Sequence, residues 1–411
     1  MIPGAMIDGR ATMIDDESPM PYEGLQVLDI SQGIAGPYCA QIMWQQGADV
    51  IKVEPPTGDW GRAVGVVRAD NSALSLQFNA GKRALALDTR TDAGRRVLLE
   101  LASRADVVIQ NFRPGVVQRM GVSYGDVTTR NPNVVYVSIS GYGPSGPSAD
   151  APATDSVMQA DSGLMYSNQD EHGHPRRVGV LMADIGTGLY AAQSLATALY
   201  HRLAHKEGSH IQISLFEACA AFQGMNFLEQ AMAGSRPFGA VSAPNGVFHT
   251  SDGRLTVVVL NNDQFARLCR ALDRGPWIDD PRFADNAARM RHKDDLHAEI
   301  GAQLHRHSTD YWTQRFSQHD VLHAPVRDYV GVINHPQAKH MEMFQQLVQP
   351  GMGIMPYMGL PARIHRRPVR PAPTIGQHSR QILFEAGLGA DRIQQLISGD
   401  VVYQAPETDG V

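Results

Sequence analysis

Asp184 is the carboxylate in this sequence best placed for covalent chemistry. It stands in the segment LMADIGTGL, where an apolar run of strand type meets a long helical pattern. A carboxylate at a helix N-terminus is favoured by unpaired backbone N–H groups and by the helix dipole. The position therefore fits a plain N-cap, and it also fits a carboxylate nucleophile. The two roles are compatible, and the residues alone leave both open.

A second group of side chains suits an anionic ligand that contains a base. Asn111, Phe112 and Arg113 follow a strand-like run, and Arg119 comes shortly after them. An amide, an aromatic ring and two guanidinium groups are able to stack on a base and to pair with phosphates. A surface loop with solvated arginines is an equally good interpretation. Further basic residues would add positive charge for such a ligand or are simply solvated: Lys82, Arg83 and Arg90.

Three other motifs do not support a phosphate loop or a metal site. The segment GYGPSGPSADAP lacks the GK[ST] ending of a P-loop and the strand-to-helix GxGxxG of a dinucleotide site. His172 with His174, and His201 with His205, have no acidic or thiolate third ligand at a recognised spacing. We therefore predict no metal.

Composition indicates a globular enzyme. The 411 residues are 43% hydrophobic and 19% charged, and the net charge of -6 is spread without long runs of one sign. A nucleic-acid backbone demands a basic stripe, so we expect no nucleic acid as a partner. Cys39, Cys219 and Cys269 form no CxxC pair, which fits a reducing cytosol. No run reaches the roughly 18 apolar residues of a membrane span, so we expect a cytoplasmic protein.

Alternating patterns predict the elements that would position these side chains. From Leu25 to the segment NPNVVYVSISGYG, short apolar runs alternate with helical spacing. This alternation is typical of a Rossmann-like α/β domain, a parallel sheet doubly wound with helices. Ligands of such sheets bind at the carboxyl ends of the strands, so loops 111–113 and 140–144 are expected at one edge. The segment DIGTGLYAAQSLATALYHRLAHK predicts one long buried helix.

Length and a change in sequence texture predict two domains. Residues 1–21 mix acids, glycine and methionine without an apolar core, so we expect a flexible extension. Residues 22–225 are expected to form the first part of the large α/β domain. Residues 226–334 are expected to form a smaller α+β domain with its linkers, including a hairpin about Asp252 and Gly253. Residues 335–411 should return to the large domain.

Several motifs in one order resemble the class III CoA-transferases, the family of formyl-CoA transferase, carnitine CoA-transferase and the α-methylacyl-CoA racemases. The similar pieces include LQVLDISQGIAGPYCAQIMWQQGADVIKVEPP, RADVVIQNFRPGVVQRMGV and ADIGTGLYAAQSLATALYHR, within about residues 24 to 265. The resemblance implies an interlaced homodimer of ring-like subunits. It also implies coenzyme A or acyl-CoA as a substrate, small carboxylic acids as its partners, and no permanently bound cofactor.

The resemblance also implies roles for individual residues. The family's catalytic aspartate falls on Asp184. Where several members carry an arginine that contacts the base or phosphates, this chain has Pro55. The positions implied to contact CoA are Ala35, Leu87 through Arg90, Asn111, Phe112, Arg113 and Arg119. The acidic residue implied at the mouth of the site is Asp155.

The sequence departs from the racemase branch at both of its proton carriers. The histidine position before Asp155 holds Thr154, and the expected glutamate position holds Asn262. We therefore expect CoA transfer through an anhydride and a thioester of Asp184, whose carboxylate should stay ionised at the helix N-terminus. An acyl-CoA racemase and a CoA-binding protein without turnover are the alternatives.

The acceptor acid is left open by the sequence. Succinyl-CoA is a common donor in the family that the chain resembles. Arg176 and Arg177 would favour a dicarboxylate, or they are solvated loop charges.

Overall fold

The structure is a computed structural model that describes residues 19–170, 172–233, 241–361 and 367–406. The chain divides into two compact units: the larger comprises the residues up to Ala231 and from Glu342 onward, and the smaller is Met232–Met341. The predicted small domain, 226–334, begins and ends a few residues before this unit. Most of the predicted N-terminal extension lies outside the described residues.

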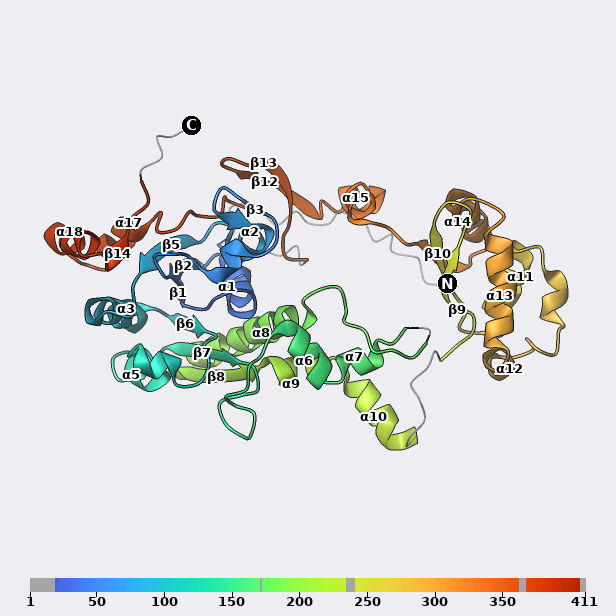
Figure 1. Ribbon diagram of the computed structural model, residues 1–411, viewed down its shortest axis with the longest axis horizontal. Coiled ribbons are helices and arrows are strands. Elements are labelled where there is room, and N and C mark those ends of the chain that lie inside the picture. The colour runs from blue at the N-terminus through green and yellow to red at the C-terminus, as the bar shows by residue number, and fades with distance from the viewer. Residues whose placement is uncertain (1–18, 171, 234–240, 362–366, 407–411) are drawn as a thin grey trace, which may run out of the picture. The chain divides into compact units, whose positions relative to one another are not determined.

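A seven-stranded sheet forms the centre of the larger unit, in the order β14-β5-β2-β1-β6-β7-β8 (Figure 1). Its parallel strands are β1 (Gln26–Asp29), β2 (Asp49–Glu54), β5 (Arg83–Leu87), β6 (Val107–Gln110), β7 (Val135–Ser140) and β8 (Ser209–Ser214). The strand β14 (Val402–Tyr403) pairs antiparallel with β5 at one edge. The parallel strands follow the doubly wound Rossmann order, with the reversal between β1 and β6. The predicted parallel α/β sheet is confirmed.

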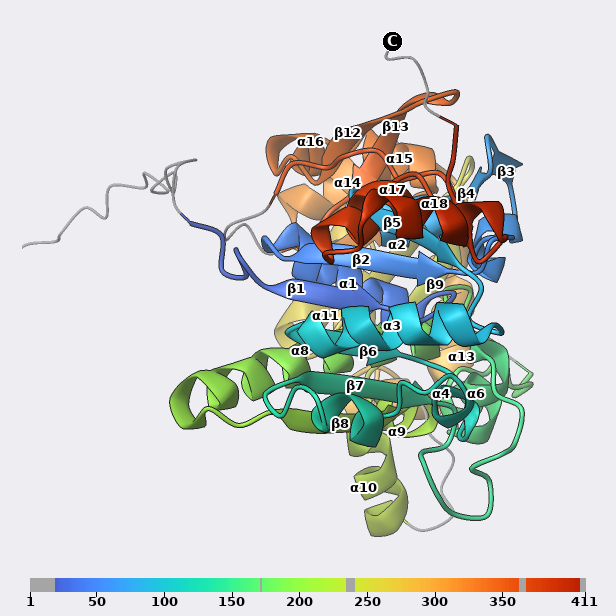
Figure 2. The same cartoon turned by 90° about the vertical axis from the view of Figure 1, so that its left-hand side faces the viewer.

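Helices cover both faces of the sheet (Figure 2). One face carries α1 (Ala35–Gln45), α8 (Met182–His205) and α9 (Leu215–Ala221). The other carries α3 (Asp92–Arg104), α5 (Tyr124–Thr128), α17 (Ser379–Glu385) and α18 (Ala390–Ser398). Successive strand residues point to opposite faces, so Val27 joins the first apolar cluster and Leu28 joins the second.

Helix α8 has 24 residues and confirms the predicted long helix, but only one of its sides is buried, because Leu189, Tyr200 and Leu203 are exposed. Small residues on its buried side allow it to lie close to α1. A Cβ atom at Gly188 would lie 2.8 Å from the carbonyl oxygen of Ala35 and 3.0 Å from Cδ1 of Tyr38. The helix ends at His205, and the next residue, Lys206, has a left-handed backbone with φ of 60°. This close packing fixes the start of α8 beside the carboxyl edge of the sheet.

Shorter elements complete the larger unit. They are η1 (Trp60–Ala63), β3 (Val67–Arg68), β4 (Asn71–Ser72), α2 (Ala73–Asn79), α4 (Val116–Arg119), α6 (Asp155–Asp161), α7 (Leu164–Ser167), β12 (Phe344–Gln349) and β13 (Gly353–Met358). The last two strands form a hairpin. Helix α10 (Gly224–Ala233) spans the boundary between the two units. No helix within the described ranges combines the length and the apolar character needed to cross a bilayer.

The smaller unit has its own sheet and core. Strands β9 (Asn245–His249), β10 (Arg254–Val258) and β11 (Leu322–Pro325) are antiparallel, and the hairpin predicted about Asp252 and Gly253 joins the first two. A buried cluster that includes Phe265, Phe283 and Trp312 forms its core. Its helical segments are α11 (Asn262–Ala271), η2 (Gly275–Ile278), α12 (Asn286–Arg291), α13 (Lys293–Leu304), α14 (Thr309–Gln318), α15 (Tyr329–Ile333) and α16 (Pro336–His340).

Candidate active site

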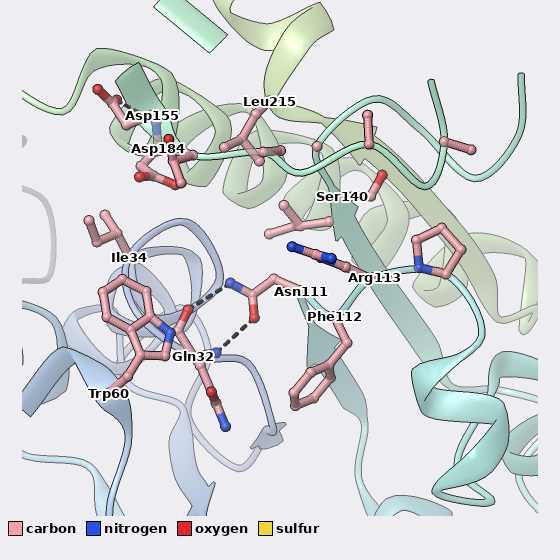
Figure 3. Close-up of a pocket in the computed structure, with 17 residues that line it drawn as sticks. Gln32, Ile34, Trp60, Asn111, Phe112, Arg113, Ser140, Asp155, Asp184 and Leu215 are labelled. Atoms are coloured by element: carbon pink, nitrogen blue, oxygen red, sulfur yellow. Dashed lines mark hydrogen bonds between the residues drawn. The ribbon is translucent and has the colours of Figure 1, made fainter. Parts of the chain in front are cut away.

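The loops after β1 and β6 meet where the strand order reverses. The side chain of Asn111, directly after β6, donates to the carbonyl oxygen of Gln32 at 2.6 Å and accepts from the Gln32 backbone N–H at 2.7 Å (Figure 3). Two reciprocal hydrogen bonds thus fasten the loop after β1 to the loop after β6. Doubly wound sheets bind ligands in the crevice at this point of reversal.

A cavity of about 330 Å³ opens beside this link. Residues from separate segments that the sequence singled out all line it: Asn111, Phe112, Arg113, Asp155 and Asp184. The other lining residues are Gln32, Ile34, Trp60, Pro114, Ile139, Ser140, Gly141, Ala149, Ala151, Ala153, Thr154 and Leu215. The glycine- and proline-containing segment rejected above as a phosphate loop therefore supplies part of the wall.

Asp184 is the third residue of α8 and not its cap, so the N-cap interpretation is wrong. The local cap position is Leu181, whose side chain makes no capping hydrogen bond. The Asp155 carboxylate, at the start of α6, caps α8 instead: its Oδ2 accepts from the backbone N–H of Ala183 at 2.8 Å and of Asp184 at 3.3 Å. A carboxylate that accepts helix N-terminal amides is stabilised by them and by the helix dipole.

Asp155 is buried, with 4% of its surface exposed, and a neighbour holds its other oxygen. Gln159 donates from Nε2 to Asp155 Oδ1 at 2.7 Å, and its own Oε1 accepts from the backbone N–H of Val178 at 2.9 Å. Asp155 therefore orients the first turn of α8 and the segment that leads into it. The resemblance implied only an acidic residue at the mouth of the site.

The environment of Asp184 does not favour its ionised form. Burial raises the pKa of this carboxyl to about 7, and the nearby charge of Asp155 adds to the increase. This increase runs against the expectation that the helix N-terminus would keep Asp184 ionised. Asp184 is instead a carboxyl of raised basicity, a property common among catalytic groups.

A second cavity of about 330 Å³ adjoins the first and shares Gln32 and Phe112 as lining residues. Leu87, Arg90 and Arg119 also line it, so these predicted contact residues lie together. Pro55 lines it as well, at the position where family members carry an arginine. Arg90 is 88% exposed and pairs with Asp88 at 2.8 Å. Arg90 and Arg119 thus line the second cavity, Asp184 lines the first, and Phe112 belongs to the walls of both.

Three of the residues proposed to serve a ligand are placed elsewhere. Ala35 lines neither cavity and lies in the apolar core beneath α8. Lys82 is fully buried and pairs with Asp29 at 2.8 Å, and Arg83 pairs with Asp49 and Glu385. Lys82 therefore neutralises a buried carboxylate and Arg83 pairs with two partly exposed ones, so the hypothesis that they add charge for a ligand is wrong.

Other candidate residues are engaged in local structure. Arg176 pairs with Asp170 at 2.7 Å, and Arg177 contacts Ser156 at 3.4 Å. Neither arginine is among the residues that line the cavity around Asp184. Asn262 begins α11 in the smaller unit, where its Oδ1 accepts from Arg289 at 3.0 Å. In the part of the chain that the structure describes, no three His, Cys, Asp or Glu side chains are grouped so that they could hold a metal ion.

The fold and the cavity define an α/β enzyme with a carboxyl group of raised pKa at the switch point of its sheet. The chain belongs to CoA-transferase family III, whose model matches residues 22–379. It is therefore a transferase of the CoA-transferase type, as the resemblance implied.

Relatives and solved structures agree with this family. The chain is 32% identical to succinyl-CoA:glutarate CoA-transferase of Homo sapiens, over 93% of this chain and 90% of that protein. It is 32% identical to acetyl-CoA:oxalate CoA-transferase of Acetobacter aceti, over 85% of this chain and 92% of that protein. A crystal structure of a CAIB/BAIF family protein from Brucella suis matches with a TM-score of 0.82 at 29% identity, covering 90% of this chain and all of that one (100%).

Proposed function

We propose that this enzyme moves CoA from an acyl-CoA donor to a carboxylic acid, with the Asp184 carboxylate as the covalent nucleophile. The observation that carries the proposal is the position of Asp184, which lies in a cavity that adjoins a second cavity edged by Arg90 and Arg119. Guanidinium groups pair with phosphates, so the diphosphate end of CoA belongs in the second cavity. The thioester end then reaches past Phe112 toward Asp184.

The reaction begins with attack of an Asp184 oxygen on the thioester carbonyl carbon. The C–S bond breaks, CoA leaves as a thiolate, and a mixed anhydride remains. The thiolate then attacks the Asp184 carbonyl carbon, which releases the donor acid as a carboxylate and leaves an aspartyl-CoA thioester. Covalent catalysis of this kind divides one difficult exchange into easier steps.

The second half reverses these steps with a new acid. The acceptor carboxylate attacks the aspartyl thioester, expels the thiolate and forms a second anhydride. The thiolate attacks the acceptor's carbonyl carbon, which yields the new acyl-CoA and restores the Asp184 carboxylate. The raised pKa of Asp184 supports this role, because a more basic carboxylate is a better nucleophile once it is ionised.

A dicarboxylic acid is the proposed acceptor class. Relatives at 31–33% identity are named for the transfer of CoA between succinate and glutarate. Arg113 is the one cationic side chain among the described residues that line the cavity around Asp184. A second carboxylate on the substrate would therefore find a partner there.

Racemisation receives no support from the cavity. It needs a pair of acid–base groups on opposite faces of the substrate carbon. Thr154 lines the cavity at the position of the family's histidine, and its hydroxyl does not titrate near neutral pH.

The test is a transfer assay with succinyl-CoA and a panel of mono- and dicarboxylic acids, read by mass spectrometry of the CoA products. New acyl-CoA should form, and Asp184→Ala should abolish it. The same assay in deuterated water distinguishes a transferase from a racemase, because a racemase would exchange the α-proton of a single acyl-CoA without an acceptor. Deuterium exchange without CoA transfer would overturn the proposal.

A further inference from the structure

We propose that Trp60 is the specificity-determining wall of the cavity, and that its indole packs on the methylene segment of the acyl group carried by Asp184. This inference rests on the proposed CoA transfer and narrows its substrates. It predicts that the enzyme prefers acids with methylene groups next to the carboxyl group over acids such as oxalate, which have none.

Trp60 differs from the other tryptophans in its exposure. It is 52% exposed, whereas Trp44, Trp277 and Trp312 are at most 8% exposed. Exposing half of an indole to water forgoes the largest apolar burial that any side chain offers. An indole kept in this position at a cavity wall is suited to being covered by a ligand.

The surroundings of Trp60 fit an apolar ligand. Trp60 and Ile34 lie on the opposite side of the cavity from Asp184 and Leu215 (Figure 3). The indole packs against Gly33, where a Cβ atom would lie only 2.0 Å from Cζ2 of the ring. The indole therefore lies directly on the Gly33 backbone, and it also lines the cavity.

Asp59, the residue before Trp60, is anchored by a buried carboxylate network. Its side chain accepts from the backbone N–H of Gly61 at 2.8 Å and of Gly33 at 3.1 Å, and it pairs with Lys52 at 2.9 Å. Both side chains of this ion pair are almost completely buried, at 1% and 4% exposure. The same carboxylate thus fixes the turn that carries Trp60 and the loop on which its ring lies.

A second buried ion pair holds the other side of the turn. Arg62 pairs with Glu54 at 2.7 Å, and Glu54 also accepts from the backbone N–H of Asp59 at 2.9 Å. Lys52 and Glu54 both belong to β2, so two charged residues of one strand anchor the turn around Trp60. Buried ion pairs contribute little net stability because their desolvation is costly. The two pairs therefore serve to fix the geometry of the turn that carries Trp60 more than to stabilise the fold.

The kinetic test compares acids with increasing numbers of methylene groups in wild type, Trp60→Phe and Trp60→Ala. Burial of one methylene corresponds to about a fourfold gain in binding, so wild-type kcat/KM should rise about fourfold per methylene until the wall is covered. Trp60→Phe should keep most of this slope, and Trp60→Ala should flatten it.

Phe384→Ala is the matched control, because Phe384 is a large side chain of α17 that is 68% exposed and lines neither cavity. The control should keep the wild-type slope. An active Trp60→Ala enzyme with the wild-type slope would overturn the inference and leave the proposed function standing. A wild-type protein that transfers no CoA would instead overturn the proposed function, and this inference with it.

A second measurement does not depend on turnover. Because Trp60 is the one exposed tryptophan, it should supply most of the fluorescence that acrylamide quenches, and Trp60→Phe should lose this component. Glutaryl-CoA should protect the wild type from quenching more strongly than free CoA does. Equal protection by glutaryl-CoA and free CoA would contradict contact between Trp60 and the acyl group.

Discussion

Two carboxyl groups with different tasks meet at the start of α8. Asp155 accepts two amide hydrogen bonds from the first turn of the helix, and Asp184 lines the cavity. Asp155 therefore influences its neighbour in two ways, since it orients the helix and places a negative charge beside Asp184. Burial, and to a lesser extent that charge, raises the pKa of Asp184.

This pair predicts a specific pH profile. Asp184 must be ionised to attack, and its pKa is about 7, so kcat/KM should fall as pH drops through about 7. Asp155→Asn should shift this acidic limb to lower pH, because it removes a negative charge and keeps an oxygen that accepts the helix amides. The midpoint of the limb should stay above the usual pKa range of a carboxyl group, since burial contributes more to the raised pKa of Asp184 than the Asp155 charge does.

Profiles of kcat/KM against pH for wild type, Asp155→Asn and Asp161→Asn check this prediction. Asp161 ends the same helix, α6, and lines neither cavity, so its variant should keep the wild-type limb. A limb that does not move in Asp155→Asn would show that the Asp155 charge does not act on the reacting group.

The loops at the strand reversal depend on Asn111. Asn111→Ala removes both hydrogen bonds to the Gln32 backbone and should lower the free energy of unfolding by about 1–3 kcal/mol. It should also lower kcat/KM for acyl-CoA by about tenfold or more, because the walls of both cavities shift. Asn131→Ala is the matched control, since this loop asparagine bonds Ala105 at 2.9 Å and lines neither cavity.

Urea unfolding and steady-state kinetics separate the two effects of Asn111. The control should lose similar stability and keep its kcat/KM. A normal kcat/KM in Asn111→Ala would mean that the link between the two loops has no role in substrate binding.

Close packing between helices α8 and α1 predicts an unusual response to alanine. Gly188→Ala should destabilise the protein by about 1–3 kcal/mol despite the helix preference of alanine, because the new Cβ would press on the Ala35 carbonyl. Gly301, inside α13, has no atom within 4 Å of its ideal Cβ, and Gly301→Ala should stabilise by about 0.5–1 kcal/mol. Thermal unfolding of both variants checks the contrast, and equal shifts would contradict it.

Much of this architecture is predictable from local pattern. Alternating apolar runs indicate the parallel sheet, and small buried residues indicate α8, because both signals depend on near neighbours along the chain. The cap that Asp155 supplies to α8 and the pairing of Lys82 with Asp29 are not local. Each joins segments far apart in the sequence, and a lysine beside an arginine in sequence gives no sign of the carboxylate it will meet.

Trp60 illustrates the same limit for the cavity. Nothing in the segment GDWGR marks a ligand contact, because the indole becomes part of the wall only when Asp59 binds Lys52 and Gly33. The sequence offers one indirect sign of where the cavity lies: Gln32 follows β1, and the first strand of a doubly wound sheet ends where the strand order reverses.

The family resemblance implies an interlaced homodimer, and we retain it as a proposal. Helix α10 exposes Met225 (68%), Phe227 (53%) and Leu228 (66%), and such an apolar group is expected to be covered in an assembly. Sedimentation should therefore find a dimer, and Met225→Glu with Leu228→Glu should weaken it by at least about tenfold. A monomeric wild-type protein at micromolar concentration would contradict the proposal.

The proposed reaction requires that Asp184 carries an acyl group during turnover. Incubation with succinyl-CoA and hydroxylamine, followed by peptide mass spectrometry, should find the hydroxamate at residue 184 and complete loss of CoA transfer. Asp184→Asn should give neither the hydroxamate nor new acyl-CoA. CoA transfer that proceeds with Asp184 unmodified, or that persists in Asp184→Asn, would contradict covalent catalysis by this residue.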